Sequence, residues 1–84
     1  MTKIAKLYAW IVANPRASLS FRDFERVLLA FGFTHSRTSG SHKAYHHAGK
    51  NKTLIIQPRG KDAKPYQVQQ FLDMVEGYDL KLED

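Results

Sequence analysis

The hydrophobic pattern of the chain changes period twice, and this change constrains the fold more than any other sequence feature. Apolar residues recur every three or four positions up to Gly32, lose that spacing from Phe33 to Pro58, and regain it after Pro65. A spacing of three or four is typical of amphipathic helices, whereas short apolar runs rich in β-branched residues indicate strands. The sequence therefore predicts two helices, a strand region and a last helix.

Local signals place the ends of the three predicted helices. The first ends before Pro15, because the residue preceding a proline avoids the helical conformation. The second begins after the N-cap Ser20 and ends at Gly32, which suits a left-handed cap, and the third runs from Pro65 to Gly77. The predicted buried stripes are Ile4, Leu7, Tyr8, Ile11 and Val12, then Phe21, Phe24, Val27, Leu28 and Phe31, then Val68, Phe71, Leu72 and Val75.

Three strands are predicted between the second and third helices, at Phe33–Ser39, His42–His47 and Thr53–Gln57, and residues 58–64 are expected to form a basic loop. Consecutive strands with short connections favour an antiparallel meander. The expected fold class is α+β, in the order α-α-β-β-β-α, with the helices on one face of the sheet and the other face available to a ligand. The helix–three strands–helix segment has the layout of a double-stranded-RNA-binding domain.

The length of 84 residues accommodates one domain. We expect a core at residues 20–77, an extra N-terminal helix at 1–15 and a loosely held acidic tail at 78–84. The chain has no cysteine, which excludes disulfides and fits a reducing compartment. No apolar run approaches the roughly twenty residues that span a bilayer, and no signal peptide is evident. The expected location is the cytoplasm, with no membrane partner.

Charge is unevenly distributed along the chain. The net charge is +5, but residues 1–31 carry +3, residues 32–64 carry +6 and residues 65–84 carry −4. A basic balance favours acidic partners, namely nucleic acid, an anionic membrane or an acidic protein. The middle segment also holds every histidine of the chain: His35, His42, His46 and His47. We therefore look for a site in this segment, although a solvated polar hairpin has the same composition.

Within this segment, one histidine directly follows a glycine turn. Gly40 permits a sharp hairpin, which would hold His42 at the start of a strand instead of on a loop. Histidine exchanges a proton near neutral pH, and nearby cations can stabilise charge that develops on phosphorus. This arrangement suits metal-independent RNA cleavage, in which a 2′-OH attacks the adjacent phosphate. An ordinary surface histidine without a task fits the same pattern.

The other polar residues of the segment have weaker individual signals. His46 shares a strand face with His42 and is either a second proton-transfer group or a solvated histidine. Tyr45 is expected at the edge of the core. The histidine spacing favours no zinc site and no cysteine or carboxylate completes one, so neither metal nor cofactor is expected. The candidates for binding RNA phosphates are Arg37, Lys43, Arg59, Lys61 and Lys64.

The same residues resemble the HicA toxin family of toxin–antitoxin modules over about residues 20–76. The most specific part is Gly40-Ser41-His42 followed by Tyr45. One departure is Lys43, where many members have a second histidine. Further matching positions are Ser20-Phe21, Leu28-Leu29, Gly32-Phe33, Arg37, Thr53–Pro58, Lys64-Pro65-Tyr66, Val68 and Gln70.

The resemblance implies an mRNA interferase, a metal-independent endoribonuclease that stops growth under stress until a HicB-like antitoxin binds it. The role of the family's catalytic histidine passes to His42, presented by the turn at Gly40 and Ser41. The toxin alone is expected to be monomeric, with the antitoxin supplying any higher assembly. Two other functions stay open, a non-catalytic RNA-binding module and an inactive relative that serves as a protein-interaction partner.

Overall fold

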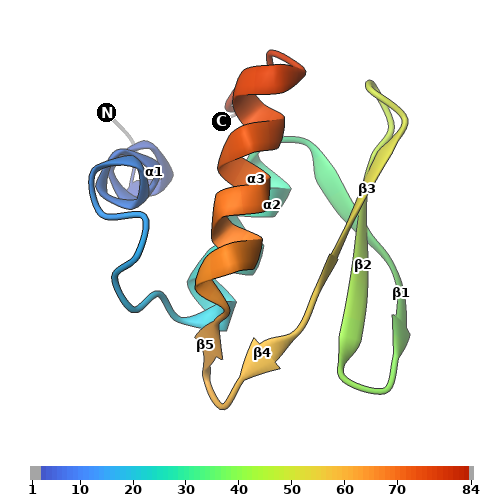
Figure 1. The fold of residues 1–84 in the computed structure, drawn as a ribbon. Coiled ribbons are helices and arrows are strands. Elements are labelled where there is room, and N and C mark those ends of the chain that lie inside the picture. Colours follow the sequence, from blue (N-terminus) through green and yellow to red (C-terminus); the bar gives the residue numbers. More distant parts are fainter. Residues whose placement is uncertain (1–2, 84) are drawn as a thin grey trace.

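The computed structural model describes residues 3–83, so the ends of the predicted 1–84 domain lie outside the described residues. The elements follow the predicted order (Figure 1). They are α1 (Lys3–Ala13), α2 (Phe21–Ala30), β1 (Phe33–Ser39), β2 (His42–His47), β3 (Lys52–Ile56), β4 (Pro58–Arg59), β5 (Asp62–Ala63) and α3 (Pro65–Gly77).

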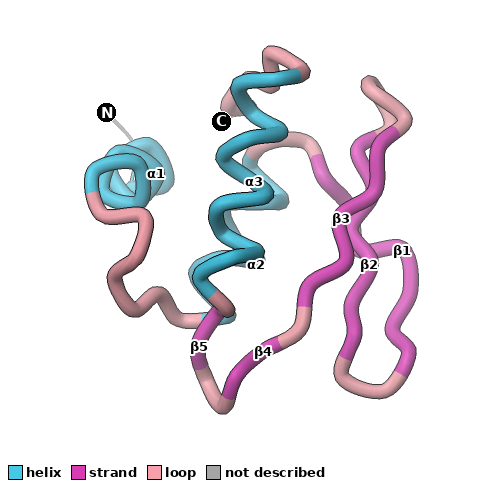
Figure 2. The backbone as a smooth tube through the Cα atoms, in the orientation of Figure 1, coloured by secondary structure: helices cyan, strands magenta, loops and turns pink. Residues whose placement is uncertain are grey.

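The three long strands form one antiparallel sheet in the order β1-β2-β3. The helices α2 and α3 cover one face of it, and α1 lies on the side of these helices away from the sheet (Figure 2). The predicted α+β fold with the layout of a double-stranded-RNA-binding domain is confirmed. Within residues 3–83, no helix is long and apolar enough to cross a membrane.

The predicted ends of α2 are confirmed by its hydrogen bonds and dihedral angles. Ser20 is extended, and its Oγ accepts a hydrogen bond of 3.1 Å from the backbone N–H of Asp23, as an N-cap does. The backbone of Gly32 reverses direction after the helix with φ of +91°. A residue with a β-carbon resists this conformation, so glycine suits the start of the sheet here.

Residues 58–64, expected to be a loop, instead contain the small β4–β5 hairpin, which turns at Gly60 with φ of +62°. The hairpin is held by the segment that enters α2. The backbone N–H of Phe21 donates to the carbonyl of Lys61, and that of Ala63 donates to the carbonyl of Leu19, both at 2.8 Å. Strands of two residues are too short to show an alternating pattern, which is why the sequence did not indicate them.

Residues 78–83 of the acidic tail are docked, so the expectation of a loosely held tail is wrong for this part of it, and Asp84 lies outside the described residues. Leu80 is buried in the core and Leu82 packs against it. The backbone N–H of Glu83 donates to the carbonyl of Ala30 at 2.6 Å, and that of Leu80 donates to the carbonyl of Val75 at 3.0 Å. Leu80 and Leu82, two residues apart on a short segment, bury apolar surface against the domain. The free energy gained by this burial holds the segment in place despite its acidic side chains.

The core is organised around the ring of Phe71 on α3, which is fully buried. Its centroid lies 5.3 Å from that of Phe31 and 5.9 Å from that of Phe24, both on the α2 side. Tyr8 of α1 and Phe33 of β1 are each 6.3 Å away. One side chain thus contacts all the layers of the fold, in the tilted and edge-on geometries that aromatic pairs prefer.

A polar contact also ties the sheet to α2. Oε2 of Glu25 accepts hydrogen bonds from the hydroxyl of Tyr45 at 2.6 Å and from Nζ of Lys43 at 3.0 Å. Burial first, and then the hydrogen bond to the Glu25 carboxylate, raise the pKa of Tyr45 above its ordinary range. Tyr45 therefore remains a hydrogen-bond donor throughout the neutral range.

We predict that Phe71→Ala lowers the free energy of unfolding by about 3–5 kcal/mol, because it leaves a cavity where three layers meet. Urea denaturation at neutral pH measures this loss. Leu29→Ala is the control, since that side chain is half exposed, and it should change stability by less than about 0.5 kcal/mol. Equal losses in the two variants would contradict the central place of Phe71.

We predict that Tyr45→Phe lowers the free energy of unfolding by about 1–3 kcal/mol at neutral pH, because Glu25 loses its shortest hydrogen bond. Since the folded pKa of Tyr45 is raised, this stabilisation is fully present below the unfolded pKa near 10 and declines above it. Urea denaturation at pH 7 and above pH 10 tests both points. Tyr78→Phe, on an exposed ring, is the control, and a loss independent of pH would contradict the explanation.

Candidate active site

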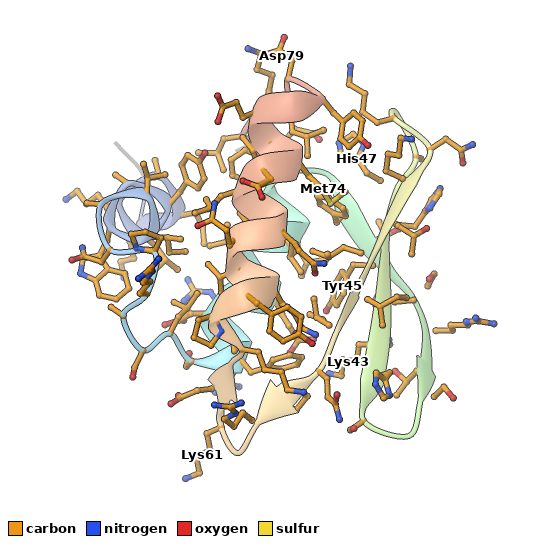
Figure 3. The ribbon with its side chains drawn as sticks, viewed as in Figure 1. Lys43, Tyr45, His47, Lys61, Met74 and Asp79 are labelled. Atoms are coloured by element: carbon orange, nitrogen blue, oxygen red, sulfur yellow. The ribbon has the colours of Figure 1, made fainter. Side chains whose placement is uncertain are left out.

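The strand register divides the side chains of β2 between two faces of the sheet. Lys43 pairs with the buried Ile56 and Tyr45 with the buried Leu54, so these residues face the helices. Figure 3 shows Lys43, Tyr45 and His47 pointing to that side. Because strand side chains alternate, the residues between them lie on the outer face, which none of the helices in residues 3–83 covers. His42 and His46 are therefore on the face predicted to be available to a ligand.

His42 lines a shallow hollow of about 120 Å³ on this outer face. Arg37 and Ser39 of β1 form one side of it, and Ile55 of β3 and Ala44 contribute apolar surface. His42 and Arg37 are both exposed, and Ile55 is 45 % exposed. The hollow thus combines a group that can exchange a proton, a permanent cation and an apolar surface.

Arg37 reaches the outer face because β1 contains a bulge. The register shifts between His35, which pairs with Tyr45, and Arg37, which pairs with Ala44. Ser36 is the extra residue, and its hydroxyl donates to the carbonyl of Ala44 at 3.1 Å. Without the bulge, Arg37 would share the inner face with His35. Bulges re-aim side chains in this way.

The turn before His42 has the geometry that the sequence predicted. Strand β1 ends at Ser39 and β2 begins at His42, so Gly40 and Ser41 alone make the connection. Gly40 has φ of +61°, in the left-handed region that glycine occupies at little cost. His42 consequently belongs to the strand ladder, where it pairs with Ser39.

The other histidines are separated from His42. His46 lies four residues along the strand, about 13 Å away at the rise of an extended chain, and its Nδ1 is 2.9 Å from Oγ1 of Thr53. That separation is too large for both rings to contact one phosphate. His35 contacts the ring of Tyr45 and His47 that of Phe33, on the inner face. Among residues 3–83, no three ligand side chains cluster closely enough to hold a metal ion.

The five candidate phosphate-binding residues occupy different places. Arg37 lies in the hollow with His42, whereas Lys43 faces the helices and is paired with Glu25. Arg59 and Lys61 are exposed on the β4–β5 hairpin, whose tip carries Lys61 in Figure 3. Nζ of Lys64, at the start of α3, donates to Oε1 of Gln57 at 3.0 Å.

Sequence reasoning missed Ile55, which lines the hollow, and the bulge at Ser36, which turns Arg37 toward it. Ile55 stands between Leu54 and Ile56, and strand alternation requires the middle residue of three to face away from the other two, so this signal was present. The bulge at Ser36 carries no comparable signal, because a serine among polar residues fits either register.

A family model described as the HicA toxin of bacterial toxin–antitoxin matches residues 21–75. The match includes α2, the whole sheet with its Gly40-Ser41-His42 turn, and nearly all of α3, whereas α1 lies before it. Comparison with curated proteins and with solved structures finds no match. The matched region is more than half of the chain, and it contains the residues that carry the resemblance. The chain therefore belongs to the HicA toxin family, the toxins of bacterial toxin–antitoxin systems.

Proposed function

We propose that this toxin is a metal-independent endoribonuclease that cleaves mRNA, with His42 as a general acid or base. The observation that carries the proposal is the outer-face hollow, where His42 and Arg37 lie together in an exposed position. Its position in the strand and the two-residue turn before it restrain His42. Such preorganisation lowers the entropic cost of placing the side chain in a geometry from which it can react.

In the proposed reaction, the 2′-OH of a nucleotide attacks its own 3′-phosphate. His42 accepts the 2′-OH proton or donates one to the departing 5′-oxygen, and a water molecule from the solvent makes the other proton transfer. The guanidinium of Arg37 stabilises the additional negative charge on the nonbridging oxygens, and its fork geometry suits phosphate. The products are a 2′,3′-cyclic phosphate and a free 5′-hydroxyl, and no metal ion is needed for either proton transfer.

The remaining candidate cations extend the proposed RNA interface. Arg59, Lys61 and Lys64 lie on or next to the β4–β5 hairpin, at the end of the molecule where the β1–β2 turn also lies (Figure 1). They would bind phosphates flanking the scissile one. Lys43 is already paired with Glu25, so we expect it to contribute least.

Membership in the family implies an antitoxin partner, and we propose that this partner is a HicB-like protein. Residues 32–64, with a net charge of +6, present the basic surface that RNA requires. An acidic partner can bind the same surface and exclude RNA by competition. Such a toxin would act in the cytoplasm, where mRNA is translated, and would be a monomer when free of its antitoxin.

We predict that the purified toxin cleaves RNA in excess EDTA and that His42→Ala slows cleavage by at least about 10²-fold, because a proton-transfer group is lost. Gel analysis of RNA and its end groups measures this. His35→Ala is the matched control, since that ring faces away from the hollow, and it should retain activity. Equal cleavage by His42→Ala would contradict the role of His42, whereas salt-dependent RNA binding without cleavage by any protein would favour a non-catalytic RNA-binding module.

In cells, we predict that expression of the toxin stops growth and that His42→Ala restores it, because growth arrest would require RNA cleavage. Colony counts after induction measure the effect, with immunoblotting to confirm equal protein levels. Arrest by both proteins would show that toxicity does not depend on His42. Normal growth with both would favour an inactive relative that acts as a protein-interaction partner.

A further inference from the structure

A chain of three polar side chains connects the β1–β2 turn to the start of α3. Nζ of Lys64 lies 3.0 Å from Oε1 of Gln57, and Nε2 of Gln57 lies 2.8 Å from Oγ of Ser41. Ser41 is the residue immediately before His42. These hydrogen bonds therefore join three segments: the β1–β2 turn, the residue that follows β3, and the N-cap residue of α3.

The chemistry of these groups fixes the direction of each hydrogen bond. An ammonium can only donate, so the amide oxygen of Gln57 must face Lys64. The amide nitrogen then faces Ser41 and can only donate, so the Ser41 oxygen must accept. Among the described residues, no side chain takes the Ser41 hydroxyl hydrogen in return. That hydrogen is free to donate to a ligand at the exposed turn.

Gln57 is itself restrained by hydrogen bonds, so it can hold the Ser41 hydroxyl in a fixed position. Its backbone N–H donates to Oε1 of Gln67 at 2.9 Å, and Gln67 is 4 % exposed. The amide nitrogen of Gln67 donates in turn to the hydroxyl of Tyr66 at 3.2 Å. The side-chain amide of Gln57 lies 2.8 Å from the hydroxyl of Ser41, the residue before His42. Gln57 is therefore restrained against the residue that precedes His42.

We propose that the Ser41 hydroxyl is a catalytic donor to a nonbridging oxygen of the scissile RNA phosphate, and that Gln57 and Lys64 are positioning residues that aim and polarise it. The inference rests on the proposed endoribonuclease function. It assigns Ser41 a chemical role beyond forming the turn, and it gives Lys64 an effect on the reaction through Gln57 in addition to its part in the proposed RNA interface.

The proposed contact involves no proton transfer. As the 2′-oxygen bonds to phosphorus, negative charge accumulates on the nonbridging oxygens and the hydrogen bond from Ser41 strengthens, while the serine keeps its proton. The positive charge of Lys64 increases the polarity of the Gln57 amide, and the Gln57 amide increases that of the Ser41 hydroxyl, because hydrogen bonds in a chain polarise one another. The effect is larger in the transition state than in the bound substrate, so it should raise kcat more than it lowers KM.

The first test compares Ser41→Ala with Ser41→Thr in RNA cleavage by the full chain. Removal of one donor of this kind costs about 10²-fold in kcat. We expect a loss of that order for Ser41→Ala with KM changed by less than about threefold, and near-normal kcat for Ser41→Thr, which keeps the hydroxyl. Thermal unfolding of each variant, together with its affinity for a 2′-deoxy oligonucleotide that cannot be cleaved, separates a catalytic loss from a misplaced turn.

The second test reverses the hydrogen bond without changing the shape of the network. Gln57→Glu keeps the contact with Lys64, but a carboxylate can only accept, so it takes the Ser41 hydroxyl hydrogen away from the substrate. We expect kcat to fall about as far as in Ser41→Ala, while thermal stability is maintained. Gln70→Glu makes the same charge change at an exposed position on α3 and should leave kcat near normal.

The outcomes distinguish this inference from the proposed function. Normal kcat in Ser41→Ala or in Gln57→Glu would overturn the inference, while the loss of cleavage in His42→Ala would still support the function. Equal losses in Ser41→Ala and Ser41→Thr would also overturn it, because they would show a steric requirement of the turn. Absence of cleavage by the unaltered toxin would overturn the function and the inference together.

Discussion

The placement of the helices relative to the sheet depends on the packing of Phe71. This ring contacts aromatic residues of α1, α2 and β1, so the layers cannot shift independently of one another. Because Phe71 anchors α3, it also sets where the first turn of that helix lies. Lys64 and Gln67 reach Gln57 from this turn, and Gln57 reaches the residue before His42. The geometry of the outer-face site is thus supported by a hydrophobic contact on the opposite side of the sheet.

Strand β2 divides structural and chemical tasks between its two faces. On the inner face, Lys43 and Tyr45 bind Glu25 and fasten the strand to α2. On the outer face, the side chains of His42 and Arg37 make no hydrogen bond or ion pair with other side chains of residues 3–83 and are exposed. The alternation of a strand makes this division possible, because adjacent residues point in opposite directions at no conformational cost. An open sheet face would be accessible to the RNA proposed as substrate, and it would be equally accessible to a protein that blocks it, which suits a toxin controlled by an antitoxin.

Much of the fold follows from local sequence signals. The Ser20 cap, the Gly32 and Gly40 turns and Pro65 all act within a few residues, and the structure places them as expected. The apolar stripes also face the core for the most part, but Val12 of α1, expected in the buried stripe, is 52 % exposed. The family resemblance carried by residues 20–76 agrees with the family match at residues 21–75. The loose tail and the basic loop were predicted wrongly because their ordering comes from contacts with distant segments. Leu80 joins the core, and the β4–β5 hairpin hydrogen-bonds to the residues before α2.

The sequence by itself determined the order of the elements, the turn that presents His42 and the concentration of positive charge around it. Periodicity, capping and composition are local properties, so a single chain displays them. Only the tertiary structure decided which of the charged residues can serve the site. The bulge at Ser36 turns Arg37 toward His42. Lys43 forms an ion pair with Glu25 on the inner face. Gln57 connects Lys64 to Ser41 through hydrogen bonds. Each of these outcomes depends on strand register or on packing between segments far apart in sequence, and long-range pairing of that kind leaves no periodic trace in the chain.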